Sequence, residues 1–530
     1  MTIKARYDVV ILGAGHNGLV AAAYLSRVGL SVLLLEKNDY IGGATASQKV
    51  FPDYEAYLSR YSYLVSLFPD KIIRDLGLNL ELRRREVASY TPYDKAGTSQ
   101  GLLLSNVSEE QSRRSITQLT GTDTEFDRMK QFYALAGCFA EKTWDTMLRP
   151  LPSQSDLRQR VATNELGREA WRSLVEEPLG NAIERYLSDD LVRGLVFTDG
   201  KIGVSTHAHD ETLLQNRCFL YHLIGNKTGE WKVPVGGMGR VAAELERAAR
   251  GHGAEMLTRV SISAINLDRQ KSVAFESEGE SQTVEARFLL VNFGSNVLAR
   301  LLRKSYQPHP TDEGSVFKIN MLLHRLPKLR DQSNDAGDAF RGTFHIDEGY
   351  AQMERSYRQA IQGKLPDQVP GEIYCHTLTD DSILAPDLRV RGFHTLTLFG
   401  IDTPWPLFAG ANDAMRQRTQ EAFISGLDQW LAEPLETCLA RAADGSPCIE
   451  AKTPVDLEEA LGLYHGNIFQ TALTFPFAET KEQEEQWGVE TEYEDVYLCG
   501  SSALRGGAVS GIPGHNAAMK VMERLGPDRC

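Results

Sequence analysis

The chain opens with Tyr7-Asp-Val-Val-Ile-Leu-Gly13-Ala-Gly15-His-Asn-Gly18-Leu-Val-Ala-Ala-Ala-Tyr-Leu25 and continues, after Gly29, with Ser31-Val-Leu-Leu-Leu-Glu36. Apolar and β-branched residues predict a strand that ends at the first glycine, and an alanine-rich helix follows it. A second apolar strand ends in an acid. The three glycines keep the G-x-G-x-x-G spacing, and the acid follows at roughly the 20 residues typical of a Rossmann unit. The stretch therefore predicts a βαβ unit that binds a dinucleotide.

Each residue of this motif has a physical role at a nucleotide site. Gly13 permits the tight turn, Gly15 lets the backbone approach a pyrophosphate, and Gly18 allows the helix to pack closely on the strand. The unpaired N–H groups and the positive dipole end of the helix would face the phosphates. The Glu36 carboxylate can accept hydrogen bonds from an adenosine ribose and would repel a 2′-phosphate, which argues against NADP.

The composition limits the class of protein. A length of 530 residues predicts two domains, either of which could be discontinuous. Acids outnumber bases by 71 to 57 and no long basic run occurs, so nucleic acid is not an expected partner. The seven cysteines are scattered and form no C-x-x-C motif, so we expect neither a disulfide framework nor a cysteine zinc site.

Targeting signals are not evident in the sequence. Few residues precede the first predicted strand, and no apolar run approaches the ~18 residues of a membrane span. We therefore expect a soluble, cytoplasmic protein without a signal peptide or transmembrane segment. The sequence leaves open peripheral membrane contact and homo-oligomerisation.

The end of the chain carries a second glycine-rich signal. Asp495-Val-Tyr-Leu-Cys499-Gly500 predicts a strand, Ser501 begins a turn, and Gly511-Ile512-Pro513-Gly514 opens a final helix. Proline in a first helical turn, with glycine before it, is typical of a helix N-terminus. Between the two ends we expect an amphipathic helix within 54–80, mainly helices over 86–227, strands at 316–323 and 395–401, and a helix over 413–430.

Both ends resemble a known family. The glycine motif, Glu36 with Lys37, and the pair Gly42-Gly43 are similar to the glutathione-reductase-like flavoproteins, in their branch of amine oxidases and carotenoid desaturases. The ending Gly506-Gly-Ala-Val-Ser-Gly-Ile-Pro-Gly-His-Asn-Ala-Ala-Met519 resembles that of the phytoene dehydrogenase-related FAD-dependent oxidoreductases. Further matches lie at Ser62-Tyr-Leu-Val-Ser-Leu67, Gly236-Gly-Met-Gly239, Leu384-Ala-Pro386 and Gly466-Asn-Ile-Phe469, so the resemblance spans nearly the whole chain.

The resemblance implies an α/β fold, with a Rossmann-like FAD-binding domain and an inserted mixed α+β substrate domain. We expect residues 1–85, 228–300 and 481–530 in the first domain and residues 86–227 and 301–480 in the second. FAD would lie with its adenine near Glu36 and its ring near the final helix. The expected cofactor-binding residues are Gly13, Gly15, Gly18, Glu36, Lys37, Gly42, Gly43, Ile262, Gly500, Ser501, Gly511, Ile512, Pro513 and Gly514.

Candidate catalytic residues are fewer. His207 and His209 form a His-x-His beside two acids, a pattern that could ligate a metal or serve in acid/base chemistry. No third ligand follows at a metal-binding spacing, so hydrogen-bonded loop histidines are favoured and no metal is expected. Arg505 stands where carotenoid desaturases tend to have histidine, and Ala44 stands where relatives often carry a phosphate-binding arginine.

The resemblance implies a desaturase or dehydrogenase that moves hydride from a substrate C–H to flavin N5. The expected substrate is an apolar or amphipathic small molecule. Three alternatives stay open: a flavin amine oxidase, a redox-neutral flavin isomerase, and a flavin-binding interaction protein with little turnover. Amine oxidases often use a lysine-held water, and Lys318 is the only lysine in a plausible substrate-domain strand.

Overall fold

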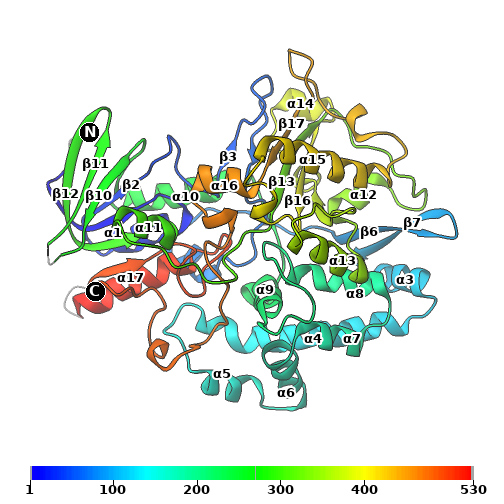
Figure 1. Cartoon of the computed structure of the whole chain (residues 1–530), viewed down its shortest axis with the longest axis horizontal. Coiled ribbons are helices and arrows are strands. Elements are labelled where there is room, and N and C mark those ends of the chain that lie inside the picture. Colours follow the sequence, from blue (N-terminus) through cyan, green and yellow to red (C-terminus); the bar gives the residue numbers. More distant parts are fainter. Residues whose placement is uncertain (1–2, 269, 527–530) are drawn as a thin grey trace.

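Two seven-stranded sheets organise the protein (Figure 1). The computed structural model describes residues 3–268 and 270–526. One sheet lies at the left of the figure, with the final helix beside it, and the other lies at the upper right. A layer of helices from the first half of the chain lies below the second sheet, in cyan.

The first sheet contains the glycine-rich motif. Its strands run in the order β10, β11, β12, β1, β2, β9, and β18 pairs with the last residues of β12. The central strands are parallel and almost fully buried, as expected for strands covered on both faces. The bounds are β1 (Arg6–Leu12), β2 (Val32–Leu35), β9 (Glu255–Leu257), β10 (Ser261–Asn266), β11 (Lys271–Ser277), β12 (Glu280–Val291) and β18 (Val496–Leu498).

Four helices share one hydrophobic core with this sheet: α1 (His16–Arg27), α2 (Asp70–Leu76), α10 (Met238–Gly251) and α17 (Ile512–Leu525). The small residues at the start of α17 make its approach to α1 close. A Cβ on Gly514 would lie 2.0 Å from the backbone oxygen of Asn17, so only glycine fits at that position. The last helix of the chain is thereby packed against the first.

The second sheet is mixed and draws its strands from two distant parts of the chain. Its order is β17, β13, β16, β15, β14, β6, β7, and β6 pairs in parallel with β14. The bounds are β6 (Val87–Lys95), β7 (Thr98–Ser105), β13 (Phe317–Leu323), β14 (Thr343–Ile346), β15 (Gly371–Tyr374), β16 (His394–Gly400) and β17 (Ile449–Lys452).

The remaining elements are helices and short strand pairs. The helical layer below the second sheet comprises α3 (Glu109–Thr120), α4 (Thr124–Thr143), α5 (Gln154–Val161), α6 (Glu165–Trp171), α7 (Leu179–Tyr186), α8 (Asp190–Phe197) and α9 (Leu214–Leu223). The others are α11 (Ser295–Leu301), α12 (Ala336–Arg341), α13 (Tyr350–Ile361), α14 (Pro386–Val390), α15 (Asn412–Asp428), α16 (Pro454–Leu461), β3 (Ser47–Gln48), β4 (Leu58–Ser59), β5 (Leu82–Arg83) and β8 (Val233–Pro234).

The structure confirms the predicted α/β fold, the strands near 316–323 and 395–401 and the helix near 413–430, within one or two residues. The helix predicted within 54–80 is wrong over most of that range, because only α2 is helical there. Pro69 disfavours helical backbone in the residue before it, and Val65 instead exchanges backbone hydrogen bonds with Lys232. Residues 86–227 also begin with the hairpin of β6 and β7, not with a helix.

Strands of the first sheet come from residues 6–35, 255–291 and 496–498, and those of the second from 87–105 and 317–452. The domain boundaries expected from the sequence stay a prediction. None of the helices in the described part of the chain is both long and apolar enough to cross a bilayer.

Candidate active site

A cavity of about 1100 Å³ is lined by residues of both sheets. Its lining includes the turn after β1, the strands β13 to β16, and part of the helical layer. Small-molecule pockets typically measure about 300–1,000 Å³. The cavity therefore has room for a large ligand, or for two molecules that meet inside it.

The nucleotide side of the cavity is built from backbone around the first turn of α1. Gly13 adopts a φ of +98°, which favours glycine. A Cβ on Gly18 would lie 2.5 Å from the Gly13 oxygen. At the end of β12, Asn292 donates from Nδ2 to the backbone oxygens of Gly13 (3.0 Å) and Gly15 (3.3 Å). The N-cap of α1 is Gly15, which has no side chain, and no side chain in the described ranges caps the helix, so its first N–H groups are open to a ligand.

Two polar side-chain atoms at this helix start lack a partner among the described residues. They are His16 Nε2 and Asn17 Oδ1, and both residues line the cavity. His16 Nδ1 lies 3.0 Å from Thr45 Oγ1, and burial lowers the pKa of this histidine to about 4. The ring is therefore neutral at physiological pH and can offer one hydrogen bond to a bound group.

Glu36 is buried at the end of β2 and lines the cavity. Its Oε2 accepts from the Ala14 N–H at 2.8 Å and its Oε1 from the Asn38 N–H at 2.9 Å. These two bonds hold the carboxylate in place while leaving lone pairs for hydroxyl groups. Burial lowers the pKa of neighbouring Lys37, whose Nζ donates to the Glu459 oxygen at 3.3 Å.

The expected cofactor residues fall into two groups, those that line the cavity and those that do not. Those that line the cavity are Gly13, Gly15, Glu36, Lys37, Gly43, Ile262 and Ser501. Those outside its lining are Gly18, Gly42, Gly500, Gly511, Ile512, Pro513 and Gly514. Gly511 and Gly514 lie where α17 packs on α1 and α2, and Ile512 belongs to the hydrophobic core of the helical layer. The preceding residues Ala508 and Val509 line the cavity in their place.

The opposite side of the cavity is aromatic and carries a buried lysine. The rings of Tyr63 and Tyr374 lie 4.3 Å apart between centroids, and Phe399 lies 5.8 Å from Tyr63. Lys318 on β13 donates from Nζ to the Tyr61 oxygen at 3.1 Å and lies 4.4 Å from the Tyr63 ring centroid. Burial lowers the pKa of Lys318 to about 7, so a large share of this amine is neutral at physiological pH.

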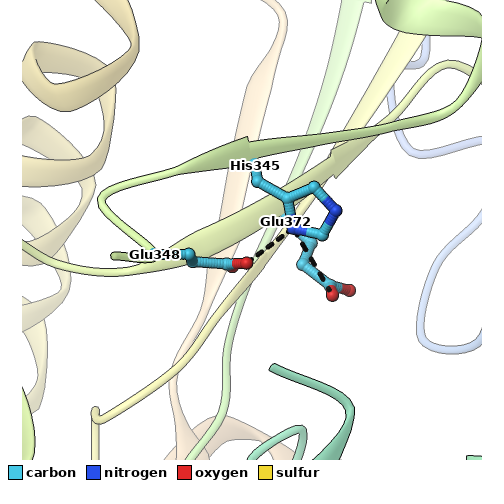
Figure 2. Close-up of side chains that lie close together, drawn as sticks. All are labelled: His345, Glu348 and Glu372. Atoms are coloured by element: carbon cyan, nitrogen blue, oxygen red, sulfur yellow. Dashed lines mark hydrogen bonds and ion pairs between the residues drawn. The ribbon is translucent and has the colours of Figure 1, made fainter. Parts of the chain in front are cut away.

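A cluster of buried acids surrounds a histidine at the same side (Figure 2). His345 on β14 and Glu372 on β15 are directly paired across the two strands, and Glu348 follows β14 in the chain. His345 Nδ1 lies 2.5 Å from Glu348 Oε2 and 3.9 Å from Glu372 Oε1. Glu372 also accepts from Thr198 Oγ1 at 3.3 Å and from the Tyr374 hydroxyl.

The protonation of this cluster is set by burial and by mutual charge. Burial lowers the pKa of His345, but the carboxylates of Glu348 and Glu372 outweigh this effect and raise it above its ordinary value. Burial and the Glu348 charge raise the pKa of Glu372. Burial also raises the pKa of Asp199, at the same wall, to about 7. The cluster therefore changes its proton content within the physiological range.

The three catalytic candidates from the sequence do not line the cavity. His209 is partly exposed, with its ring nitrogens beside Asn181 Oδ1 (3.1 Å) and Glu184 Oε1 (2.9 Å). The His207 ring lies 5.1 Å from the Tyr357 ring between centroids, at an interplanar angle of 34°. Arg505 is buried and donates to the backbone oxygens of Thr146, Arg149 and Trp487, so it fixes the turn after β18.

Several cavity residues were missed by sequence reasoning. Asn292 directly follows the apolar run Phe288-Leu-Leu-Val291, which is typical of a buried strand, so the sequence carried a usable signal that Asn292 lies at the edge of a parallel sheet. The signal for His345, Glu372 and Asp199 was much weaker. They come from two strands and a turn that are far apart in the chain, and no motif spacing joins them.

Comparison with known proteins gives matches along the chain. The model of the NAD(P)-binding Rossmann-like domain matches residues 11–71. The protein Rv0897c of Mycobacterium tuberculosis is 43% identical over 532 residues, which covers 99% of this chain and 98% of the relative. Pyridine nucleotide-disulfide oxidoreductase domain-containing protein 2 of Rattus norvegicus is 28% identical, covering 99% of this chain and 94% of the relative.

More distant proteins also match this chain over nearly its full length. One of the limonene dehydrogenase subunits of Castellaniella defragrans is 22% identical, covering 98% of this chain and 95% of the relative. A solved structure of a putrescine oxidase variant has a TM-score of 0.56 at 18% identity, covering 98% of this chain and 99% of the oxidase. With these matches and both glycine-rich ends in place, the chain belongs to the oxidoreductase family that includes Rv0897c and pyridine nucleotide-disulfide oxidoreductase domain-containing protein 2.

Proposed function

We propose that the protein binds FAD and uses it to dehydrogenate a small apolar or amphipathic molecule. The observation that carries this proposal is the shared cavity. Residues of the nucleotide motif and buried ionisable residues of the second sheet line the same space of about 1100 Å³. A dinucleotide that starts at Glu36 would therefore extend toward a second chamber with room for a substrate.

The residues around the first turn of α1 fit FAD. The unpartnered atoms His16 Nε2 and Asn17 Oδ1 offer hydrogen bonds to a polar ligand. A Cβ on Gly43 would lie 3.2 Å from the Gly15 Cα, so the backbones of the two glycines approach closely and neither glycine adds a side chain next to the first turn of α1. The open N–H groups of α1 suit a pyrophosphate.

Each part of FAD has residues to hold it. Glu36 would accept the ribose hydroxyls, and the backbone near Ile262 would meet the adenine. Ser501, Ala508 and Val509 would approach the ring system, and the start of α17 would support them from behind. When bound, FAD supplies a two-electron acceptor for hydride. The protein contributes position, exclusion of water by the aromatic wall, and proton transfer at buried side chains.

The relatives support this class of reaction. The limonene dehydrogenase relative is named for the oxidation of a hydrocarbon, and the tyrosine and phenylalanine wall around Tyr63 suits an apolar ring or chain. Amine oxidation is the second candidate, and Lys318 favours it. Its Nζ is buried at the cavity with a pKa near 7, so it can hold a water or accept a proton.

Anaerobic mixing of the purified protein with candidate substrates tests the proposal. The protein should be yellow and should release FAD on denaturation, and dehydrogenation should bleach the flavin. A geometric change of the ligand without net bleaching would indicate an isomerase, and peroxide with aldehyde in air would indicate an amine oxidase. No flavin spectrum after reconstitution with excess FAD would overturn the proposal.

A further inference from the structure

We infer that His345 is the general base of this protein, oriented by Glu348, and that it takes the substrate proton at Nε2. This inference rests on the proposed function, since a dehydrogenation releases one proton for every hydride. His207, His209 and Arg505 do not line the cavity, so none of these three candidates is placed to accept that proton.

The His345 ring is hydrogen-bonded at Nδ1, and its Nε2 has no hydrogen-bond partner among the described residues. Its Nδ1 lies 2.5 Å from Glu348 Oε2, a hydrogen bond that fixes the ring orientation and places the proton on Nδ1 in the neutral form. Nε2 forms no hydrogen bond with any residue in the described parts of the chain. In Figure 2 this second nitrogen points away from both carboxylates. His345 also lines the cavity.

A base hydrogen-bonded to a carboxylate is the arrangement that proton-transfer sites commonly use. The carboxylate stabilises the imidazolium that forms when Nε2 takes a proton. Glu348 is a positioning residue here, because it acts on the ring and is not among the residues that line the cavity. Glu348 Oε1 has no partner among the described residues, so the carboxylate acts mainly on His345.

The proposed step balances in atoms and electrons. The substrate C–H bond breaks with its electron pair, which leaves as hydride to the proposed FAD. The neighbouring X–H bond breaks, its electrons form the C=X double bond, and its proton goes to His345 Nε2. A histidine is too weak a base for an unactivated hydrocarbon. The substrate therefore carries an amine N–H, an alcohol O–H, or a C–H next to a carbonyl.

The surrounding groups decide the pH at which this base works. The acids Glu348, Glu372 and Asp199 act on His345 from the loop after β14, from β15 and from the turn Thr198–Gly200, and all three favour the protonated ring. Arg85 and Tyr374 act on the two other acids. His345 is therefore a competent base above its raised pKa, and proton transfer should become faster as the pH rises through it.

Diethyl pyrocarbonate, which modifies neutral imidazole, tests the geometry without turnover. We expect the FAD-loaded protein to be modified at His345, located by peptide mass spectrometry, with a rate that rises with pH. In Glu348→Gln the midpoint should move to lower pH. Exposed His252 reports that the reagent is active. Failure of His345 to react at pH 8.5 would overturn the inference, as would an unchanged midpoint in Glu348→Gln.

The same experiment separates a base from a metal ligand. His345, Glu348 and Glu372 lie close enough together to hold a cation. The 2.5 Å between Nδ1 and Oε2 is shorter than the roughly 3.3 Å between two zinc ligands in a tetrahedral site. If modification of His345 appears only after treatment with a chelator, a metal occupies the cluster and the base assignment is wrong.

Flavin reduction tests the chemical role with probes that share one carbon ring: cyclohexylamine, cyclohexanol, cyclohexanone and methylcyclohexane. We expect His345→Gln to slow anaerobic reduction by a reactive probe about 10²- to 10⁴-fold without loss of bound FAD. The matched control is His376→Gln, which removes a histidine 3.7 Å from Asp380 outside this cavity.

The two proposals fail in different ways. Equal reduction rates in the wild type and His345→Gln, or reduction by methylcyclohexane alone, would overturn the base assignment and leave the proposed dehydrogenation standing. If none of a wide range of candidate substrates bleaches the flavin of the wild type, the proposed function fails, while the modification experiment still decides whether His345 presents a free Nε2 to the cavity.

Discussion

The two sides of the cavity are built on different principles. The nucleotide side presents backbone: glycines, the open start of α1 and a carboxylate held by two N–H groups. The side formed by the second sheet presents ionisable side chains whose pKa values are shifted by burial and by neighbouring charges, among them Lys318, His345 and Glu372. The backbone turn on the first side is encoded by a local sequence pattern, whereas the side chains on the second side are brought together from distant parts of the chain.

This difference predicts how the two sides respond to substitution. Substitutions on the nucleotide side should weaken cofactor binding, because they alter the steric fit of the cofactor. Substitutions on the side of the second sheet should leave the cofactor bound, because they alter charge; they should change how stability or flavin reduction depends on pH. The predictions below test that separation, from the largest expected effect to the smallest.

The largest effect is expected for Gly15→Val. A Cβ at this position would lie 3.1 Å from Asn292 Nδ2, and the valine methyl groups would occupy space that the pyrophosphate requires. We expect FAD affinity to fall about 1000-fold, or about 4 kcal/mol, measured by fluorescence titration. Gly410→Val is the control, since its Cβ would meet open space at the surface. Full FAD affinity in Gly15→Val would mean that the motif is not the binding site.

Arg505→Met should mainly destabilise the fold, because the Arg505 side chain does not line the cavity. The guanidinium donates to the backbone oxygens of Thr146 and Arg149 at 2.8 Å and of Trp487 at 2.9 Å. The variant leaves these buried oxygens without a donor, and we expect the free energy of unfolding to fall by about 3 kcal/mol. Chemical denaturation measures this effect.

If Arg505 were catalytic, Arg505→Met would instead slow flavin reduction and leave the stability unchanged. The exposed Arg524, which pairs with Asp495, supplies the control variant Arg524→Met, whose stability should change much less.

Lys318→Met should change the pH dependence of stability. Burial lowers the pKa of this lysine to about 7 in the folded protein, against about 10.4 in an unfolded chain. Between these values the unfolded chain binds more protons, so the lysine makes the wild type more stable as the pH rises.

The size of this effect follows from the same pKa difference. Relative to Lys318→Met, the wild type should gain about 2 kcal/mol between pH 7 and pH 9. FAD affinity should stay the same in both proteins. Thermal or chemical unfolding at several pH values measures the gain, and a difference that does not vary with pH would show that Lys318 is charged when folded.

The sequence predicted one side of the cavity far better than the other. Gly13, Gly15 and Glu36 lie within a single βαβ unit, so their spacing alone indicated where they meet. His345 and Glu372 are neighbours only because β14 and β15 pair in one particular register, which no local pattern encodes. The helix predicted within 54–80 failed for a related reason: Val65 exchanges backbone hydrogen bonds with the distant residue Lys232, and these tertiary hydrogen bonds decide the conformation of the segment.

The smallest effect is expected for His209→Ala, although His-x-His was the most reactive-looking pattern in the sequence. Its ring nitrogens lie beside Asn181 and Glu184, and its side chain is 45% exposed. Exposed pairs of this kind contribute about 0–1 kcal/mol, so stability should change by less than about 1 kcal/mol and flavin reduction not at all. His345→Gln provides the contrast, because it removes a histidine that lines the cavity. A loss of flavin reduction in His209→Ala comparable to that in His345→Gln would mean that chemistry extends beyond the cavity, and the division between its two sides would no longer describe how this protein works.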